Sequence, residues 1–132
     1  MVDRRLLPGD SPDAVLRELE EVVASVLRPE DGIAGIVELH HHPFEPAEIP
    51  ADSPFAARVL DAVEAVTGER PPYTGTPYGS DVRNLVNDAG MEAVTFGPGE
   101  VTGAHCPDER LGLAELRQAA LVVTMVAVDL LA

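Results

Sequence analysis

The chain has 132 residues, enough for one compact domain with a buried core. Its 9 basic side chains stand against 23 acidic ones, and the formal charge of −14 at pH 7 argues against nucleic acid and membrane surfaces as partners. The single cysteine, Cys106, excludes an internal disulfide and favours a cytoplasmic location, and the first residues lack the apolar stretch of a signal peptide.

The first expected element is a short strand over residues 2–7, which ends at a proline-glycine turn signal. Ser11 and Pro12 predict the start of a helix, because a serine hydroxyl accepts an unpaired backbone N–H and proline suits the first helical position. Apolar residues at helical spacing extend this helix to about residue 27: Val15, Leu19, Val22, Val23 and Val26.

A second strand is expected over residues 33–39, where β-branched and apolar residues precede three histidines. On a strand, His40 and His42 would share one face and chelate a metal ion, while His41 would point to the other face. The alternative is that these histidines are ordinary polar residues at the end of a strand. Strand, helix and strand in this order suggest half of a two-layer βαβ-type unit.

Residues 44–50 are proline-rich and are expected to form an extended linker. Ser53 and Pro54 repeat the helix-start signal, and this second helix is expected to end at Gly68. A final helix over residues 114–131 is apolar on most faces, so it needs cover on more than one side. Its apolar run is too short to span a membrane.

Between these helices, Ser80 is expected to cap a third helix that ends at Gly90. Residues 92–96 then predict a short strand that leads into a glycine-rich loop. The mixture of helices and strands indicates an α/β fold. The ionisable residues between positions 79 and 109 lie where such a fold places a site, at the carboxyl end of a strand.

His105 follows the glycine-rich loop, and a neutral imidazole on a loop is a common zinc ligand. The alternative is a surface or hydrogen-bonded histidine. Cys106 is either a soft metal ligand or a nucleophile, or else an inert thiol beside a proline. Asp108 and Glu109 are expected to be loop carboxylates that are solvated or that accept nearby backbone N–H groups.

Two arginines are candidates for substrate binding in this acidic chain. Arg5 and Arg83 each offer a bidentate fork to a substrate carboxylate, and each has the alternative of pairing with a surface acid. Asp81 lies where a helix dipole favours an anion and needs no functional role. The Gly97–Gly99 stretch lacks the spacing and the lysine of a phosphate-binding loop.

Four stretches stand out together: Asp3–Gly9, Gly79–Arg83, Phe96–Gly99 and Ala104–Glu109. In order and spacing they resemble the C-terminal part of a zinc metallopeptidase family. That family includes acetylornithine deacetylase, succinyl-diaminopimelate desuccinylase, aminoacylase and glutamate carboxypeptidase. Each stretch alone is a weak signal, but the combination is quite specific, and the resemblance covers essentially the whole chain.

The resemblance implies an α/β fold in which a three-layer, sheet-containing catalytic domain is interrupted by a two-layer βαββαβ lid, or dimerisation, domain. Residues 1–43 would then be the second half of the lid. Residues 44–50 would be a linker, and residues 51–132 would be the final segment of the zinc-peptidase catalytic domain.

The family's chemistry would make His105 a ligand to one of two zinc ions, with cobalt as an alternative ion, in a site where water attacks an amide carbonyl. Arg5 falls at the lid arginine that binds the substrate carboxylate. The other candidates would line the substrate pocket: Ser80, Arg83, Gly97 and Gly99. The implied substrate is a small N-acyl amino acid or peptide.

The family's other metal ligands have no counterpart in this chain: a His-x-Asp motif, a bridging aspartate and a Glu-Glu pair that includes the general base. One histidine cannot complete a two-metal site. We therefore expect a chain that is inactive alone and that needs a complementing N-terminal half. The alternative is a non-catalytic remnant that forms a homo-oligomer or binds a partner, since a half lid would leave strand edges open for pairing.

Overall fold

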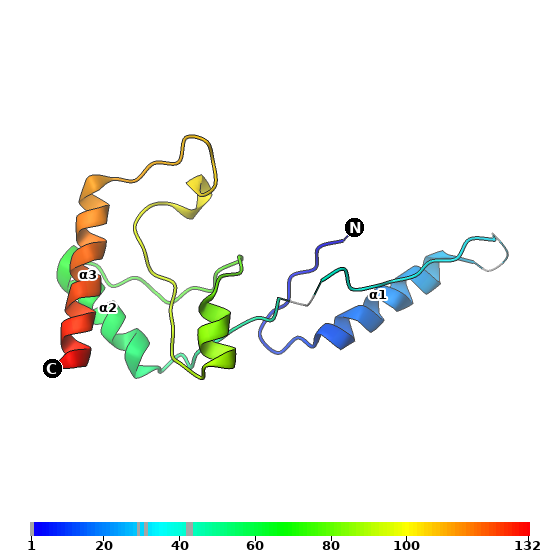
Figure 1. The fold of residues 1–132 in the computed structure, drawn as a ribbon, viewed down its shortest axis with the longest axis horizontal. Coiled ribbons are helices and arrows are strands. Elements are labelled where there is room, and N and C mark those ends of the chain that lie inside the picture. The colour runs from blue at the N-terminus through cyan, green and yellow to red at the C-terminus, as the bar shows by residue number, and fades with distance from the viewer. Residues whose placement is uncertain (1, 29, 31, 42–43) are drawn as a thin grey trace.

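The structure is a computed structural model, and it describes residues 2–28, 30, 32–41 and 44–132. In chain order the helices are α1 (Pro12–Val26), α2 (Pro54–Thr67), the π-helix η2 (Asn84–Asp88), the 3-10 turn η3 (Val101–Gly103) and α3 (Leu113–Leu131) (Figure 1). Helices α2 and α3 pack side by side, whereas α1 lies at the opposite end of the molecule.

Serine caps, each followed by a proline, fix the starts of α1 and α2. Ser53 is the N-cap of α2, and its Oγ accepts a hydrogen bond from the Ala56 N–H at 3.1 Å. Ser11 caps α1 in the same way through the Ala14 N–H, at 3.4 Å. At the end of α2, Gly68 has a φ of 80°, a left-handed conformation that glycine adopts without steric cost. The predictions for these three helix ends are confirmed.

The core of the described residues lies between α2 and α3. Ala62 and Val63 of α2 pack with Val122 of α3, which is only 1% exposed. At the surface, the Arg58 guanidinium donates to Oδ2 of Asp129 at 2.9 Å. Burial of apolar side chains drives this pairing, because an exposed ion pair contributes little. Partly buried valines surround the core: Val59, Val66 and Val126.

The expected α/β fold, with a three-layer sheet segment and half of a βαββαβ lid, is wrong. The described residues form helices, turns and irregular segments and contain no strand or sheet. Residues 2–7, 33–39 and 92–96 were the expected strands, but no backbone hydrogen bond among the described residues joins one of them to another. A strand needs a neighbouring strand to pair with its backbone N–H and C=O groups. An apolar, β-branched sequence favours the extended conformation but does not supply that neighbouring strand.

The third expected helix is shorter than its sequence pattern predicts. The Arg83 N–H bonds to the Ser80 carbonyl at 3.3 Å, and the regular part that follows is η2. Gly90 ends the segment with a φ of 63°, as predicted. The Met91 N–H then donates back to the Leu85 carbonyl at 2.9 Å, which closes the turn in the manner common after a helix.

The region around α1 packs more loosely than the α2 and α3 pair. A Cβ added at Gly35 would lie 2.7 Å from Cγ1 of Val23 and 2.5 Å from Cδ1 of Leu27. Residues 32–41 therefore run closely along the end of α1, as Figure 1 shows. Even so, Val22 and Val26 remain 54% and 69% exposed, and α1 has no buried residue.

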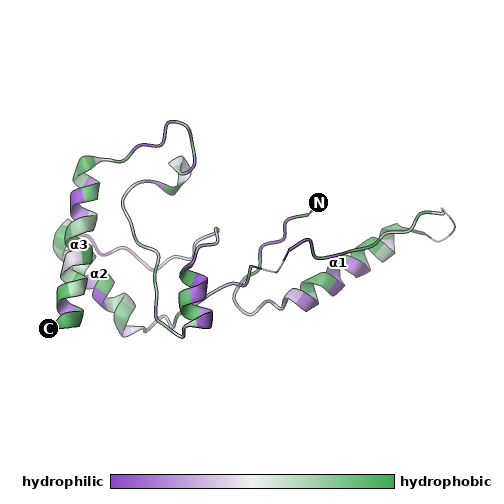
Figure 2. Ribbon diagram, in the orientation of Figure 1, coloured by the Kyte–Doolittle hydropathy of each residue, from purple (hydrophilic) through white to green (hydrophobic). Residues whose placement is uncertain are grey.

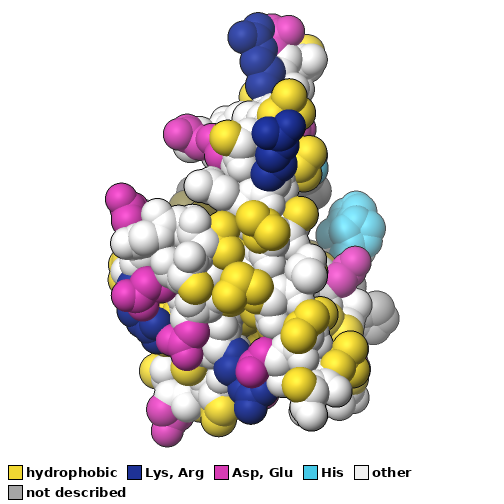
Figure 3. Space-filling model, turned by 90° about the vertical axis from the view of Figure 1, so that its left-hand side faces the viewer, with side chains coloured by type: hydrophobic (Ala, Val, Ile, Leu, Met, Phe, Trp, Pro, Cys, Tyr) yellow, Lys and Arg dark blue, Asp and Glu magenta, His cyan; other side chains and the backbone are white. Residues whose placement is uncertain are grey.

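Helix α3 is covered on one side only by the described residues. Ala119 and Val122 are buried, whereas six large apolar side chains between the helix ends are 42% to 62% exposed: Leu116, Leu121, Val123, Met125, Val128 and Leu130. Figure 2 shows apolar residues along much of α3, and Figure 3 shows apolar side chains gathered on the face at this end of the molecule. No helix in the described part of the chain combines the length and apolar character needed to cross a membrane.

Candidate functional site

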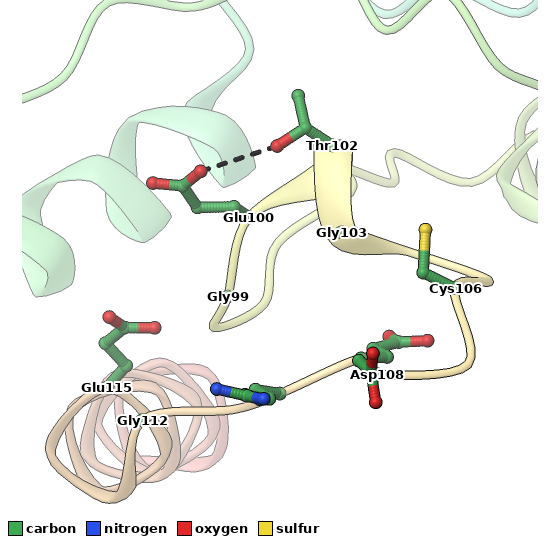
Figure 4. Close-up of a pocket in the computed structure, with 10 residues that line it drawn as sticks. Gly99, Glu100, Thr102, Gly103, Cys106, Asp108, Gly112 and Glu115 are labelled. Carbon is green, nitrogen blue, oxygen red and sulfur yellow. Dashed lines mark hydrogen bonds between the residues drawn. The ribbon is translucent and has the colours of Figure 1, made fainter.

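The loop that leads into α3 surrounds an open hollow of about 440 Å³. Figure 4 shows Cys106 and Glu115 on opposite sides of this hollow, with Gly99 between them. Most charged side chains of its lining are acidic: Glu100, Asp108, Glu109 and Glu115, against the one lining cation, Arg110. Such a hollow disfavours a phosphate group, because its own charge is negative.

His105 lies on this loop in a left-handed backbone conformation. Its φ of 64° is the only positive value among the described residues other than glycine. The His105 N–H donates to Oε2 of Glu109 at 3.0 Å. This bond confirms the prediction that Glu109 is a loop carboxylate that accepts a backbone N–H. The His105 side chain is left exposed at the surface.

The donor groups near His105 do not fit a complete metal site. Within the described residues, no three histidine, cysteine, aspartate or glutamate side chains gather closely enough to hold an ion. Cys106 is an exposed free thiol, and Glu109 already accepts a backbone hydrogen bond. A catalytic zinc typically takes three protein ligands, and the described donors of this loop do not supply such a set.

Arg83 belongs to a second group of candidate residues, which lies against the linker. Its guanidinium carbon is 4.4 Å from the centroid of the Phe44 ring, so the cation rests on the aromatic face. Its Nε is buried without a hydrogen-bond partner, and none of the ion pairs among the described residues includes Arg83. Ser80, half-buried, lies just before it and accepts its backbone N–H.

Arg5 is separate from both groups. Its Nη2 is 3.3 Å from Oδ2 of Asp3, and the two side chains are 69% and 71% exposed. This is the surface pairing that the sequence left open as the alternative to substrate binding. Figure 1 places the N-terminal segment (blue) well away from the loop over residues 97–112 (yellow to orange).

The structure therefore brings only some of the predicted site residues together. It places them in three parts of the chain: Arg5 in the N-terminal segment, Ser80 and Arg83 beside the linker, and Gly97, Gly99 and His105 in the loop before α3. Gly99 lines the acidic hollow, with a φ of 90° that suits glycine. Neither the hollow beside Gly99 nor a second hollow between α2 and α3 takes in residues from more than one of these three parts.

The histidines after residue 39 do not follow the predicted alternation. His40 Nδ1 and His41 Nε2 share a hydrogen bond of 2.8 Å, and the two rings meet edge to face. The prediction that a strand places His41 on the opposite face from His40 is wrong, because the chain bends here instead of continuing as a strand. His42 lies outside the described residues, so the predicted pairing of His40 with His42 stays a prediction.

Sequence analysis missed Phe44, which contacts Arg83 and also packs against Gly79. The signal that was available is its residue type. Phe44 is one of three phenylalanines in the chain, and it lies in a proline-rich linker where a large apolar side chain has no turn-making role. Its contacts with Gly79 and Arg83 join residues that are far apart in the sequence, and no local sequence pattern predicts them.

The family comparison agrees with the motifs at the level of the broad peptidase family, although the expected sheet is absent from the described residues. The chain matches the family described as Peptidase family M20/M25/M40 over residues 4–129. No solved structure matches the chain. The matched range takes in all three parts of the chain that hold candidate site residues, from Arg5 to His105. A match of this extent shows that the protein belongs to the peptidase family M20/M25/M40.

Proposed function

We propose that this chain contributes the C-terminal part of a zinc-dependent amide hydrolase that acts on a small N-acyl amino acid or peptide. The observation that carries the proposal is the match to a peptidase family over residues 4–129. Members of that family are generally metal-dependent hydrolases. Within it, the motifs at residues 79–83 and 104–109 favour the group of acetylornithine deacetylase, succinyl-diaminopimelate desuccinylase and glutamate carboxypeptidase.

In this proposal His105 is one metal ligand, and the ion is zinc, with cobalt as the alternative. The support is its exposed imidazole, a common zinc ligand. The remaining ligands and the general base come from outside the described residues, because the donors described do not gather in threes. We therefore expect the chain to be inactive by itself and to work with a complementing N-terminal half, in the cytoplasm.

The proposed substrate-binding residues are Arg5, Ser80, Arg83, Gly97 and Gly99. Arg83 has the strongest support, because it makes no ion pair with a described acid and so keeps its charge for a substrate carboxylate. Arg5 is less well supported, since it already pairs with Asp3. That pair is exposed and weak, and a carboxylate that binds through both guanidinium nitrogens would replace it.

The test is the zinc content of the purified chain after loading and dialysis, measured alone and after mixing with the N-terminal half of a family member. We expect no retained zinc alone, and retained zinc with hydrolysis of N-acyl amino acids in the mixture. His105→Ala should abolish both, and the control Cys106→Ser should change neither. Hydrolysis at enzymatic rates by the isolated chain would overturn the need for a second half.

The second candidate function is a non-catalytic remnant that associates with itself or with a partner. The observation that favours it is the row of half-exposed apolar side chains on α3. The two functions differ in a sedimentation experiment combined with the zinc measurement. A stable homodimer that holds no zinc, and that an N-terminal half neither dissociates nor activates, favours the remnant over the split enzyme.

A further inference from the structure

The linker makes its firmest contact through one aromatic ring. One face of Phe44 carries the Arg83 guanidinium, whose central carbon is 4.4 Å from the ring centroid. The ring also packs against Gly79, so closely that a Cβ there would overlap ring carbons. A residue of the linker is thus held by two residues of a segment far along the chain.

The chemistry of these two neighbours suits this arrangement. Gly79 leaves room for the ring, which alanine would not, since the contacting atoms belong to a rigid aromatic system. Arg83 has a planar cation that stacks on an aromatic face, which the compact ammonium of lysine does less well. The Nε of Arg83 is buried and bonds to no acceptor, so the guanidinium is held in place by the stack rather than by a hydrogen bond at that atom.

A second contact fixes the direction of the linker. Nδ2 of Asn87 donates to the Pro46 carbonyl at 3.1 Å. Two contacts, at Phe44 and at Pro46, therefore join successive points of the linker to successive points of the segment around η2. The ring of Pro46 also restricts its own φ, so the stretch between the contacts has little freedom left.

The linker matters because the region around α1 has no other described anchor. Helix α1 packs against no other described helix, and only α2 and α3 form a helix pair. The position of residues 2–41 relative to the segment over residues 79–89 then depends on where the chain is held as it enters residues 44–50. A proline-rich linker is a semi-rigid spacer by itself, so the contacts at Phe44 would add a fixed direction to a stretch that is already partly stiff.

We propose that Phe44 is an anchor residue that fastens the linker to the segment over residues 79–89, so that residues 2–41 leave this segment at a fixed joint. The inference does not depend on the peptidase function, because it concerns how two parts of the chain are held. It also gives Arg83 a structural contact that is separate from any substrate.

The test is backbone order in the linker, measured by the heteronuclear NOE of the Glu45, Ala47 and Glu48 amides. In the unaltered chain these values should approach those of α2. Phe44→Leu keeps an apolar side chain but removes the stacking face, and it should lower the NOE of these amides below that of the unaltered chain. Tyr73→Leu is the matched control, since it removes a half-exposed aromatic ring elsewhere and should leave the linker unchanged.

A second variant tests the contact from the other side. Gly79→Ala leaves Phe44 and Arg83 in the chain but places a methyl group where the ring lies, so it should also lower the linker NOE. Its control is Gly75→Ala, because nothing lies within 4 Å of a Cβ there. Unchanged amide shifts of α2 and α3 would show that the fold persists. Low linker NOE values in the unaltered chain, or values that neither variant lowers, would overturn the proposal.

Discussion

Helices α1 and α2 begin alike and end in different surroundings. Each starts with a serine cap and a proline, and they are 15 and 14 residues long. Helix α2 buries Ala56, Ala62 and Val63, two of them against Val122 of α3, whereas α1 buries no residue. Ser53 is 1% exposed at the start of α2, while Ser11 is exposed at the start of α1.

The difference separates two steps of folding. Local signals decide where a helix starts, and they work equally well in both regions. Docking needs a second apolar surface that is close in space, and most of the stability of a helix in a protein comes from that packing. Substitutions that change helix capping or helix docking in one region at a time can test this separation.

The largest effect is expected in the core between α2 and α3. Val122→Ala removes buried methyl groups and leaves a cavity, so the free energy of unfolding should fall by about 2 kcal/mol. The measurement is urea unfolding followed by helical circular dichroism. Val123→Ala is the matched control, because Val123 is 58% exposed and should cost no more than about 0.5 kcal/mol. Equal losses would mean that the two helices do not dock as described.

The two serine caps provide the next test. Ser53→Ala leaves the Ala56 N–H without its partner at a buried helix start, and it should cost about 1 kcal/mol. Ser11→Ala should cost less, because water replaces the longer bond to Ala14 at an exposed start. Both variants are compared by urea unfolding. A larger loss for Ser11→Ala would reverse the order of stability that we assign to the two regions.

A smaller effect is expected where residues 32–41 contact α1. Gly35→Ala places a methyl group against Val23 and Leu27, and it should push this segment away from the helix. The free energy of unfolding should fall less than for Ser53→Ala, because the end of the Leu27 side chain can rotate away from the added methyl group. Chemical shifts of the residue 33–39 amides report the displacement. Gly75→Ala is the control, because a Cβ there meets nothing within 4 Å. If Gly35→Ala changes the shifts of the residue 33–39 amides no more than Gly75→Ala does, the contact with α1 is absent in solution.

The smallest effect is expected for the ion pair that links α2 and α3. Arg58 and Asp129 have side chains that are 47% and 63% exposed, so their pairing should contribute about 0.5 kcal/mol or less. A double-mutant cycle with Arg58→Ala and Asp129→Ala measures this coupling. The coupling should shrink as salt is added. A coupling that is large and independent of salt would mean that charge, and not the valine core, holds the pair together.

Much of the helical structure could be read from the sequence, because its signals are local. Ser53, Gly68 and Gly90 each act on residues within one or two turns, and all three end or start helical segments as predicted. The strands could not be read in this way. Residues 33–39 have the composition of a strand, but pairing depends on a partner far along the chain, which no local pattern provides.

The same limit applies to the candidate site. The role of Glu109 as an acceptor for a nearby backbone N–H was predictable, since donor and acceptor lie in one loop. The stack of Phe44 on Arg83 was not, because it joins the linker to a distant segment. The predicted roles of Arg5 and His105 in one site rest on the order of the motifs in the sequence. Whether their side chains lie close together depends on three-dimensional packing, which the motifs do not describe.

The backbone at His105 bears on how this loop would change under selection. A side chain at a φ of 64° costs about 1 kcal/mol relative to glycine, so His105→Gly would relax the loop. Selection for thermal stability alone would therefore favour glycine at position 105. If His105 is the metal ligand proposed above, histidine should persist at this position despite that cost.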